Sequence, residues 1–75
     1  MTLTPSLTEK TAFSLAVDVI IHTNNQLSKI DRKLSVLDMN CIRAKSQEIY
    51  RQAPNIKKED AFFKVYNYTV NEVVN

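Results

Sequence analysis

The sequence predicts an all-α fold, either a small three-helix bundle or a helical hairpin with a third helix. The chain of 75 residues contains no glycine. Glycine is the usual residue wherever a hairpin turn, a β-bulge or a phosphate-binding loop needs positive φ or close backbone approach. Apolar residues also recur at helical spacing along most of the chain. Helices are therefore the elements that this composition builds most easily.

Length and cysteine content predict a single domain over residues 1–75 that self-associates. A chain of this size buries only about 60–65% of the surface that its unfolded form exposes, so its core is thin. Small domains compensate with disulfides, metal or a partner subunit. The lone cysteine, Cys41, forbids an intrachain disulfide. We therefore expect a homo-oligomer, in its simplest form a homodimer.

The first helix is expected over residues 6–23. Ser6-Leu7-Thr8-Glu9 has the pattern of a capping box at a helix start. The pair Asn24-Asn25 favours a turn, because asparagine tolerates left-handed backbone. In the alternative, one helix runs on to about Ser35. Such a helix would be about 45 Å long, a poor shape for a lone chain of this size, although a dimeric coiled coil would accommodate it.

Apolar residues follow heptad-like spacing through this region and beyond it. One series is Phe13, Ile20, Leu27 and Leu34, and a second series three positions behind it is Ala16, Thr23, Ile30 and Leu37. Thr23 is the only polar residue in the two series. A single chain of this size is too small to bury an apolar seam of this length, which again favours association.

The second helix is expected over residues 26–53. Its apolar stripe continues until Pro54, whose ring and missing amide hydrogen stop a helix at the preceding residue. Ser35-Val36-Leu37-Asp38 is another capping-type signal, so a further boundary near residues 33–35 stays open. Cys41 lies on the apolar stripe and is expected to be buried; the alternative is a reactive thiol beside Arg43.

The third helix is expected over residues 56–73. Asn55 can cap it, acidic residues suit its positively polarised start, and Phe62, Tyr66 and Val70 share one face. Residues 63–70 are also rich in aromatic and β-branched side chains, which favour strands. The sequence offers no other strand to pair with it, so the strand alternative requires pairing across a dimer.

The sequence predicts a protein that is not an enzyme and that carries no cofactor or metal. Asp18 and His22 stand one helical turn apart, which predicts a surface pair that supports the helix. Catalysis would need a further nucleophile, oxyanion donor or metal, and the chain has one histidine and one cysteine from which to build such a site. None of the usual zinc-ligand spacings occurs.

The late aromatic residues predict a site for a protein partner. Aromatic side chains and arginine are enriched at interface cores, and helical spacing can bury only one face of this segment. The predicted partner-binding residues are Arg51, Phe63, Tyr66 and Tyr68. We therefore expect a regulator or inhibitor that occupies a surface of another protein.

A basic segment supports an alternative function in nucleic-acid binding, as a small dimeric regulator. Residues 29–58 hold eight Lys or Arg against three Asp or Glu, while the whole chain carries a net charge of only +2. If residues 27–53 formed one helix, a basic stripe would face phosphates. Its members are Lys29, Arg32, Lys33, Arg43 and Arg51.

The start of the chain predicts a cytoplasmic protein without a membrane segment. The sequence Met1-Thr2-Leu3-Thr4-Pro5 lacks the basic region and apolar run of a signal peptide. The longest apolar run is too short to span a bilayer.

Overall fold

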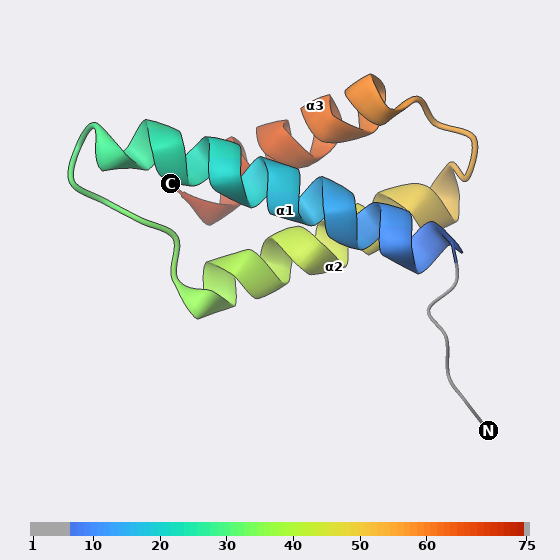
Figure 1. The fold of residues 1–75 in the computed structure, drawn as a ribbon, viewed down its shortest axis with the longest axis horizontal. Helices are drawn as coiled ribbons and strands as arrows, with labels where there is room; N and C mark the ends of the chain where they lie inside the picture. The colour runs from blue at the N-terminus through green and yellow to red at the C-terminus, as the bar shows by residue number, and fades with distance from the viewer. Residues whose placement is uncertain (1–6, 75) are drawn as a thin grey trace.

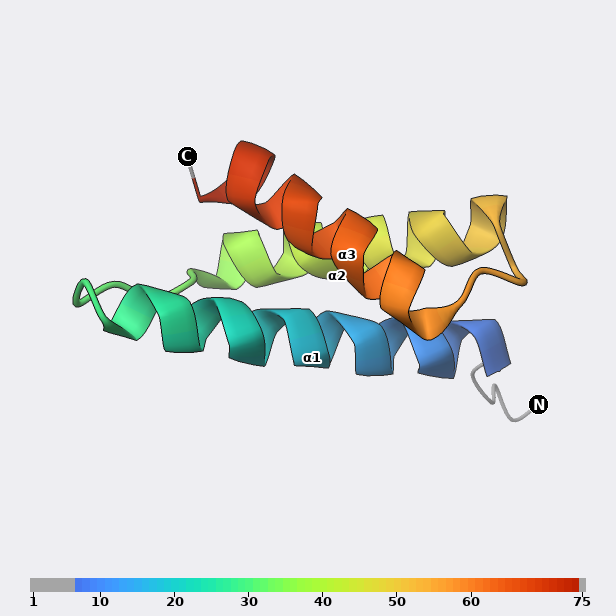
Figure 2. The same ribbon diagram turned by 90° about the horizontal axis from the view of Figure 1, so that it is seen from above.

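The protein is an all-α bundle, as predicted; the computed structural model describes residues 7–74. Helices α1 (Leu7–Ser28), α2 (Val36–Gln52) and α3 (Lys58–Tyr68) pack against one another, and a π-helical turn, η1 (Thr69–Val73), continues α3. Helices α1 and α2 run antiparallel, and α3 lies obliquely over both (Figure 1, Figure 2). Residues 63–70 are helical, so the strand alternative is wrong.

The bounds of the first two helices differ from the expected ones. Helix α1 continues through Asn24 and Asn25, and a loop over residues 29–35 separates it from α2. The expected break at residue 23 and the expected helix over 26–53 are therefore wrong. Asn24 acts from within the helix instead, because its side-chain Oδ1 accepts a hydrogen bond of 2.8 Å from the Leu34 amide. The predicted cap at Ser6 lies outside the described residues.

The chain leaves α1 through a Schellman motif with Asp31 in the left-handed position. The φ angle of Asp31 is 59°. The Arg32 amide donates to the Leu27 carbonyl at 2.9 Å, and the Asp31 amide donates to the Ser28 carbonyl at 3.2 Å. This pair of bonds defines the motif, whose left-handed residue is usually glycine. Because this chain contains no glycine, Asp31 occupies the left-handed position.

A capping box begins α2, which confirms the boundary that the sequence left open near residues 33–35. The Asp38 amide donates to Ser35 Oγ at 3.1 Å, and the Ser35 amide donates to Asp38 Oδ2 at 3.0 Å. The reciprocal bonds satisfy two amides that no helical carbonyl reaches. Helix α2 then ends at Gln52, two residues before Pro54, as the proline predicts.

Helix α3 begins later than expected, and its start has no side-chain cap. The N-cap residue is Lys57 rather than Asn55, and its side chain makes no capping hydrogen bond. Glu59 and Asp60 lie in the first turn, where negative charge offsets the helix dipole. After Tyr68 the helix widens, and the Val74 amide reaches the Thr69 carbonyl at 2.9 Å.

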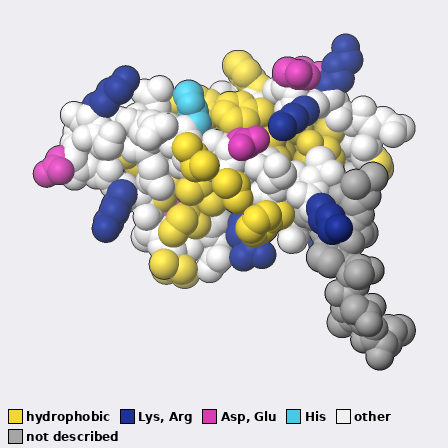
Figure 3. All heavy atoms as spheres, in the orientation of Figure 1, with side chains coloured by type: hydrophobic (Ala, Val, Ile, Leu, Met, Phe, Trp, Pro, Cys, Tyr) yellow, Lys and Arg dark blue, Asp and Glu magenta, His cyan; other side chains and the backbone are white. Residues whose placement is uncertain are grey.

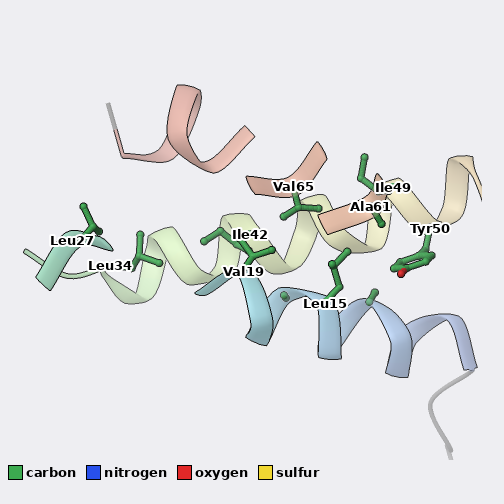
Figure 4. Close-up of a cluster of buried hydrophobic side chains, with 11 residues drawn as sticks. Leu15, Val19, Leu27, Leu34, Ile42, Ile49, Tyr50, Ala61 and Val65 are labelled. Carbon is green, nitrogen blue, oxygen red and sulfur yellow. The ribbon is translucent and has the colours of Figure 1, made fainter. Parts of the chain in front are cut away.

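The core lies between the three helices and consists mainly of aliphatic side chains (Figure 4). Its buried members are Ala12, Leu15, Ala16, Val19, Leu27, Leu34, Ile42, Ile49, Tyr50, Ala61 and Val65. The alanines allow the helix backbones to approach closely, and each large aliphatic residue contributes about 1.5–3 kcal/mol on burial. No phenylalanine belongs to this buried set.

The heptad-like series does not form one continuous seam. Leu27 and Leu34 are buried, whereas Phe13, Ile30 and Leu37 are 56%, 62% and 75% exposed. Phe13 lies on α1 outside the stripe of Leu15 and Val19 that meets the core. The loop over residues 29–35 turns the chain back and changes which face of α2 meets the core, which leaves Leu37 exposed. The expectation of a single seam is therefore wrong.

Three polar side chains are buried with the core. The hydroxyls of Ser46 and Thr69 each donate to the carbonyl one turn back, on Ile42 and Val65, at 2.8 Å. The Thr23 hydroxyl has no hydrogen-bond partner among the described residues, although its side chain is only 3% exposed. A buried hydroxyl without a partner destabilises the fold.

Candidate functional site

An apolar surface extends over α1 and α2 on the side of the molecule that Figure 3 shows. We call it the α1/α2 surface and define it as Phe13, Val17, Ile21, Val36 and Met39. Phe13, Ile21 and Val36 are 56%, 55% and 69% exposed, and the other two members are half-buried. The three α1 residues are spaced by four, so they form one ridge along the helix.

Arg43 of α2 contacts Phe13 of α1 and so links the two helices at this surface. Its guanidinium carbon lies 5.5 Å from the centre of the Phe13 ring, within the range of a cation–π interaction. Val36 and Met39 precede Arg43 by seven and four residues, which places them on the same side of α2. The α1/α2 surface is therefore continuous across the two helices.

Asp18 borders the α1/α2 surface on the side that faces α3. Its Oδ2 lies 3.8 Å from the Lys58 ammonium, and both side chains are exposed. The expected pairing of Asp18 with His22 is wrong, because His22 turns to α3. The centre of its ring lies 5.8 Å from that of Phe62 and 5.0 Å from that of Tyr66, in edge-to-face geometry.

A second apolar region is an open hollow where α2, the following loop and α3 meet. We call it the α2/α3 hollow; its volume is about 490 Å³, and it is lined by Ala53, Ile56, Asp60, Phe63 and Lys64. The Phe63 ring is 64% exposed. Lys64 also lines a neighbouring hollow of about 480 Å³, which extends along α2 and α3 to Tyr68.

The predicted partner-binding residues do not form one cluster. Phe63 and Tyr68 line the two neighbouring hollows. Tyr66 instead stacks on Phe62, with ring centres 6.2 Å apart, on the side that meets His22 of α1. Arg51 is exposed in the last turn of α2 and lines neither hollow.

Tyr68 lies in a polar environment. The Lys45 ammonium is 5.3 Å from the centre of its ring. Burial raises the pKa of the Tyr68 phenol, and the neighbouring Cys41 sulfur and the carboxylates of Glu72 and Glu48 act in the same direction. Cys41 is exposed on α2 beside this ring, so the expectation that Cys41 is buried is wrong. The loop before α2 sets a helical phase in which Ile42 points to the core instead.

The predicted basic stripe does not lie on one helix. Lys29, Arg32 and Lys33 lie in the exposed loop after α1, while Arg43 and Arg51 lie on α2. The stripe required an unbroken helix over residues 27–53, which the loop interrupts. What remains is a short basic loop at one end of the bundle, separate from the Arg43 contact with Phe13.

The α1 half of the α1/α2 surface is not among the residues predicted from the sequence. A three-helix bundle needs one apolar stripe from each helix, and in α1 the stripe of Leu15 and Val19 meets the core. Val17 and Ile21 are apolar residues in excess of that stripe. Phe13, Val17 and Ile21 are spaced four residues apart, and this spacing is the signal in the sequence that indicates a second apolar face on α1.

The described residues contain no group of three or more histidine, cysteine, aspartate or glutamate side chains placed to hold a metal ion. None of the helices found among them has the length and apolarity needed to cross a membrane. No protein-family model matches the sequence, and comparison with curated proteins and with solved structures returns no match.

Proposed function

We propose that this protein acts without catalysis, by binding another protein, and that it regulates or inhibits that partner. One observation carries the proposal: apart from Tyr50, the buried core consists of alanine and aliphatic residues, while Phe13 and Phe63 are more than half exposed. Large aromatic side chains stabilise a fold most when they are buried. Phe13 is part of the α1/α2 surface and Phe63 lines the α2/α3 hollow, and contiguous exposed apolar regions typically mark interaction sites.

The α2/α3 hollow is the proposed partner site. Phe63 offers a rigid apolar side chain at its edge, and Asp60 and Lys64 supply charges of both signs beside it. An anchor that combines an aromatic ring with polar neighbours matches the composition of interface hot spots. Tyr68 extends the site along α3, whereas Arg51 and Tyr66 line neither hollow and are not part of the proposed site.

Binding assays with surface variants test this proposal. The immobilised protein should capture its partner from a lysate of the organism that makes it, and Phe63→Asp should abolish the capture. Val70→Asp is the matched control, because Val70 is an exposed residue at the same end of the chain that does not line the hollow. Circular dichroism verifies that both variants are folded. Equal capture by the wild type and by Phe63→Asp would remove the hollow from the site.

Nucleic-acid binding is the second candidate function, and the basic loop favours it. Lys29, Arg32 and Lys33 lie within one exposed loop. Phosphate contacts from these residues would make the affinity fall steeply as salt rises. A gel-shift series on mixed DNA and RNA decides the matter, since no binding at about 50 mM salt would exclude this function. A cytoplasmic location belongs to both proposals.

A further inference from the structure

We propose that the α1/α2 surface binds a second copy of this chain, so that two bundles pair through their α1 helices. The inference is independent of the partner site at the α2/α3 hollow. It goes beyond an expectation of self-association, because it assigns the interface to named residues and specifies a pairing of charges across it.

The shape of the α1/α2 surface suits a copy of itself. Phe13, Val17 and Ile21 form a ridge of residues spaced by four. Two such ridges interdigitate when helices cross at about −50°, the commonest packing of helices in globular proteins. Helix α1 has 22 residues, so it is about 33 Å long and extends beyond this ridge at both ends. The crossing point would lie near Val17.

The charges on the two sides of the α1 ridge are complementary under two-fold symmetry. Arg43 flanks the ridge on the α2 side, over Phe13, and Asp18 flanks it on the α3 side. A two-fold axis in the interface plane, close to the direction of α1, exchanges these two sides. Arg43 of one copy then faces Asp18 of the other, and the reciprocal pair forms by symmetry. The net charge of +2 per chain opposes this association only weakly.

The area is also adequate for a dimer. Three side chains that are more than half exposed and two that are half-buried present on the order of 300 Å² of apolar surface, which is the size of an interface core within a patch of about 800 Å² per partner. An interface of this size is compatible with a dissociation constant in the micromolar range. Pairing would bury Phe13, Ile21 and Val36, which the single chain leaves more than half exposed.

Solution mass measured against concentration tests the inference. Sedimentation of the intact chain from about 1 μM to about 500 μM should show a monomer–dimer equilibrium. Ile21→Glu, at the centre of the surface, should raise the dissociation constant more than about 100-fold. The matched control is Leu37→Glu. Leu37 is more exposed than Ile21, but it lies one turn before Cys41, on the side of α2 that faces Tyr68. That variant should dimerise normally.

A charge exchange identifies the occupant as a second copy. Arg43→Glu alone and Asp18→Arg alone should each weaken the dimer on the order of tenfold, because two pairs become repulsive in each dimer. The double variant should recover the wild-type dissociation constant, since every pair is attractive again. Circular dichroism verifies the fold of each variant, and Phe63→Asp should leave the mass unchanged.

Three results would overturn the proposal. The first is a monomer at every concentration, which would leave the α1/α2 surface to another molecule. The second is a dimer that Ile21→Glu does not dissociate, which would place the interface elsewhere. The third is a double variant that dimerises no better than the single ones, which would refute the Arg43–Asp18 pairing.

Discussion

Replacing Asp31 by glycine should stabilise the protein. Asp31 occupies the left-handed position of the motif that ends α1, with φ of 59°. A left-handed conformation costs an ordinary residue about 1–2 kcal/mol, and aspartate lies at the low end because its short polar side chain tolerates it. Glycine removes this cost but loses about 0.5 kcal/mol more backbone entropy on folding. The net gain is therefore about 0.5 kcal/mol.

Urea denaturation measures this gain. Asp31→Gly should move the midpoint to higher urea without changing the slope, since the surface exposed on unfolding is unchanged. For a domain of this size, about 0.5 kcal/mol corresponds to a rise in Tm of roughly 2–4 °C. The protein concentration is held constant, so that self-association contributes equally to both chains.

A glycine placed in a regular helix is the control. Ala44 is exposed in the middle of α2, so Ala44→Gly should lower the free energy of unfolding by about 1 kcal/mol. The two substitutions introduce the same residue and should act with opposite sign. A loss of stability in Asp31→Gly would show that the aspartate side chain contributes more than its backbone conformation costs.

Further substitutions and a pH series test other parts of the fold. Thr23→Val should raise the free energy of unfolding by about 1 kcal/mol, because it removes a buried hydroxyl that has no partner among the described residues. Thermal unfolding measures this change, with Thr69→Val as the control because the Thr69 hydroxyl donates a hydrogen bond to the Val65 carbonyl. Equal effects of the two substitutions would contradict the prediction. Ser35→Ala should cost about 1 kcal/mol by removing the cap of α2, and an unchanged urea midpoint would refute that role. The raised pKa of the Tyr68 phenol implies that the unfolded chain releases this proton first as the pH rises. Stability should therefore be complete below about pH 10 and fall above it, less steeply in Tyr68→Phe.

Local signals in the sequence were sufficient for the fold class and for the end of α2. The proline at position 54 and the Ser35–Asp38 capping box both act within a few residues, but the capping box only left a boundary open, and the expected second helix began at residue 26. The end of α1 was not predictable in this way. Asn24-Asn25 has the composition of a turn, but Asn24 is held in the helix by a hydrogen bond to Leu34, ten residues away.

The candidate surfaces were predictable only in part. The late aromatics indicated Phe63 correctly as an exposed side chain. Periodicity could not show that Tyr66 packs against His22, because that contact depends on how α3 crosses α1. The same limit applies to Cys41, whose exposure follows from the helical phase that the loop over residues 29–35 imposes on α2.

We propose that this chain keeps large apolar side chains at its surface for recognition rather than for folding. The free energy of unfolding of Phe63→Ala, measured beside that of Leu15→Ala, tests this proposal. Leu15 is 1% exposed and its truncation should cost about 2–5 kcal/mol. Phe63→Ala should cost about 1 kcal/mol or less, because its ring is already mostly in water. Equal losses for the two variants would show that Phe63 belongs to the core and would contradict the claim.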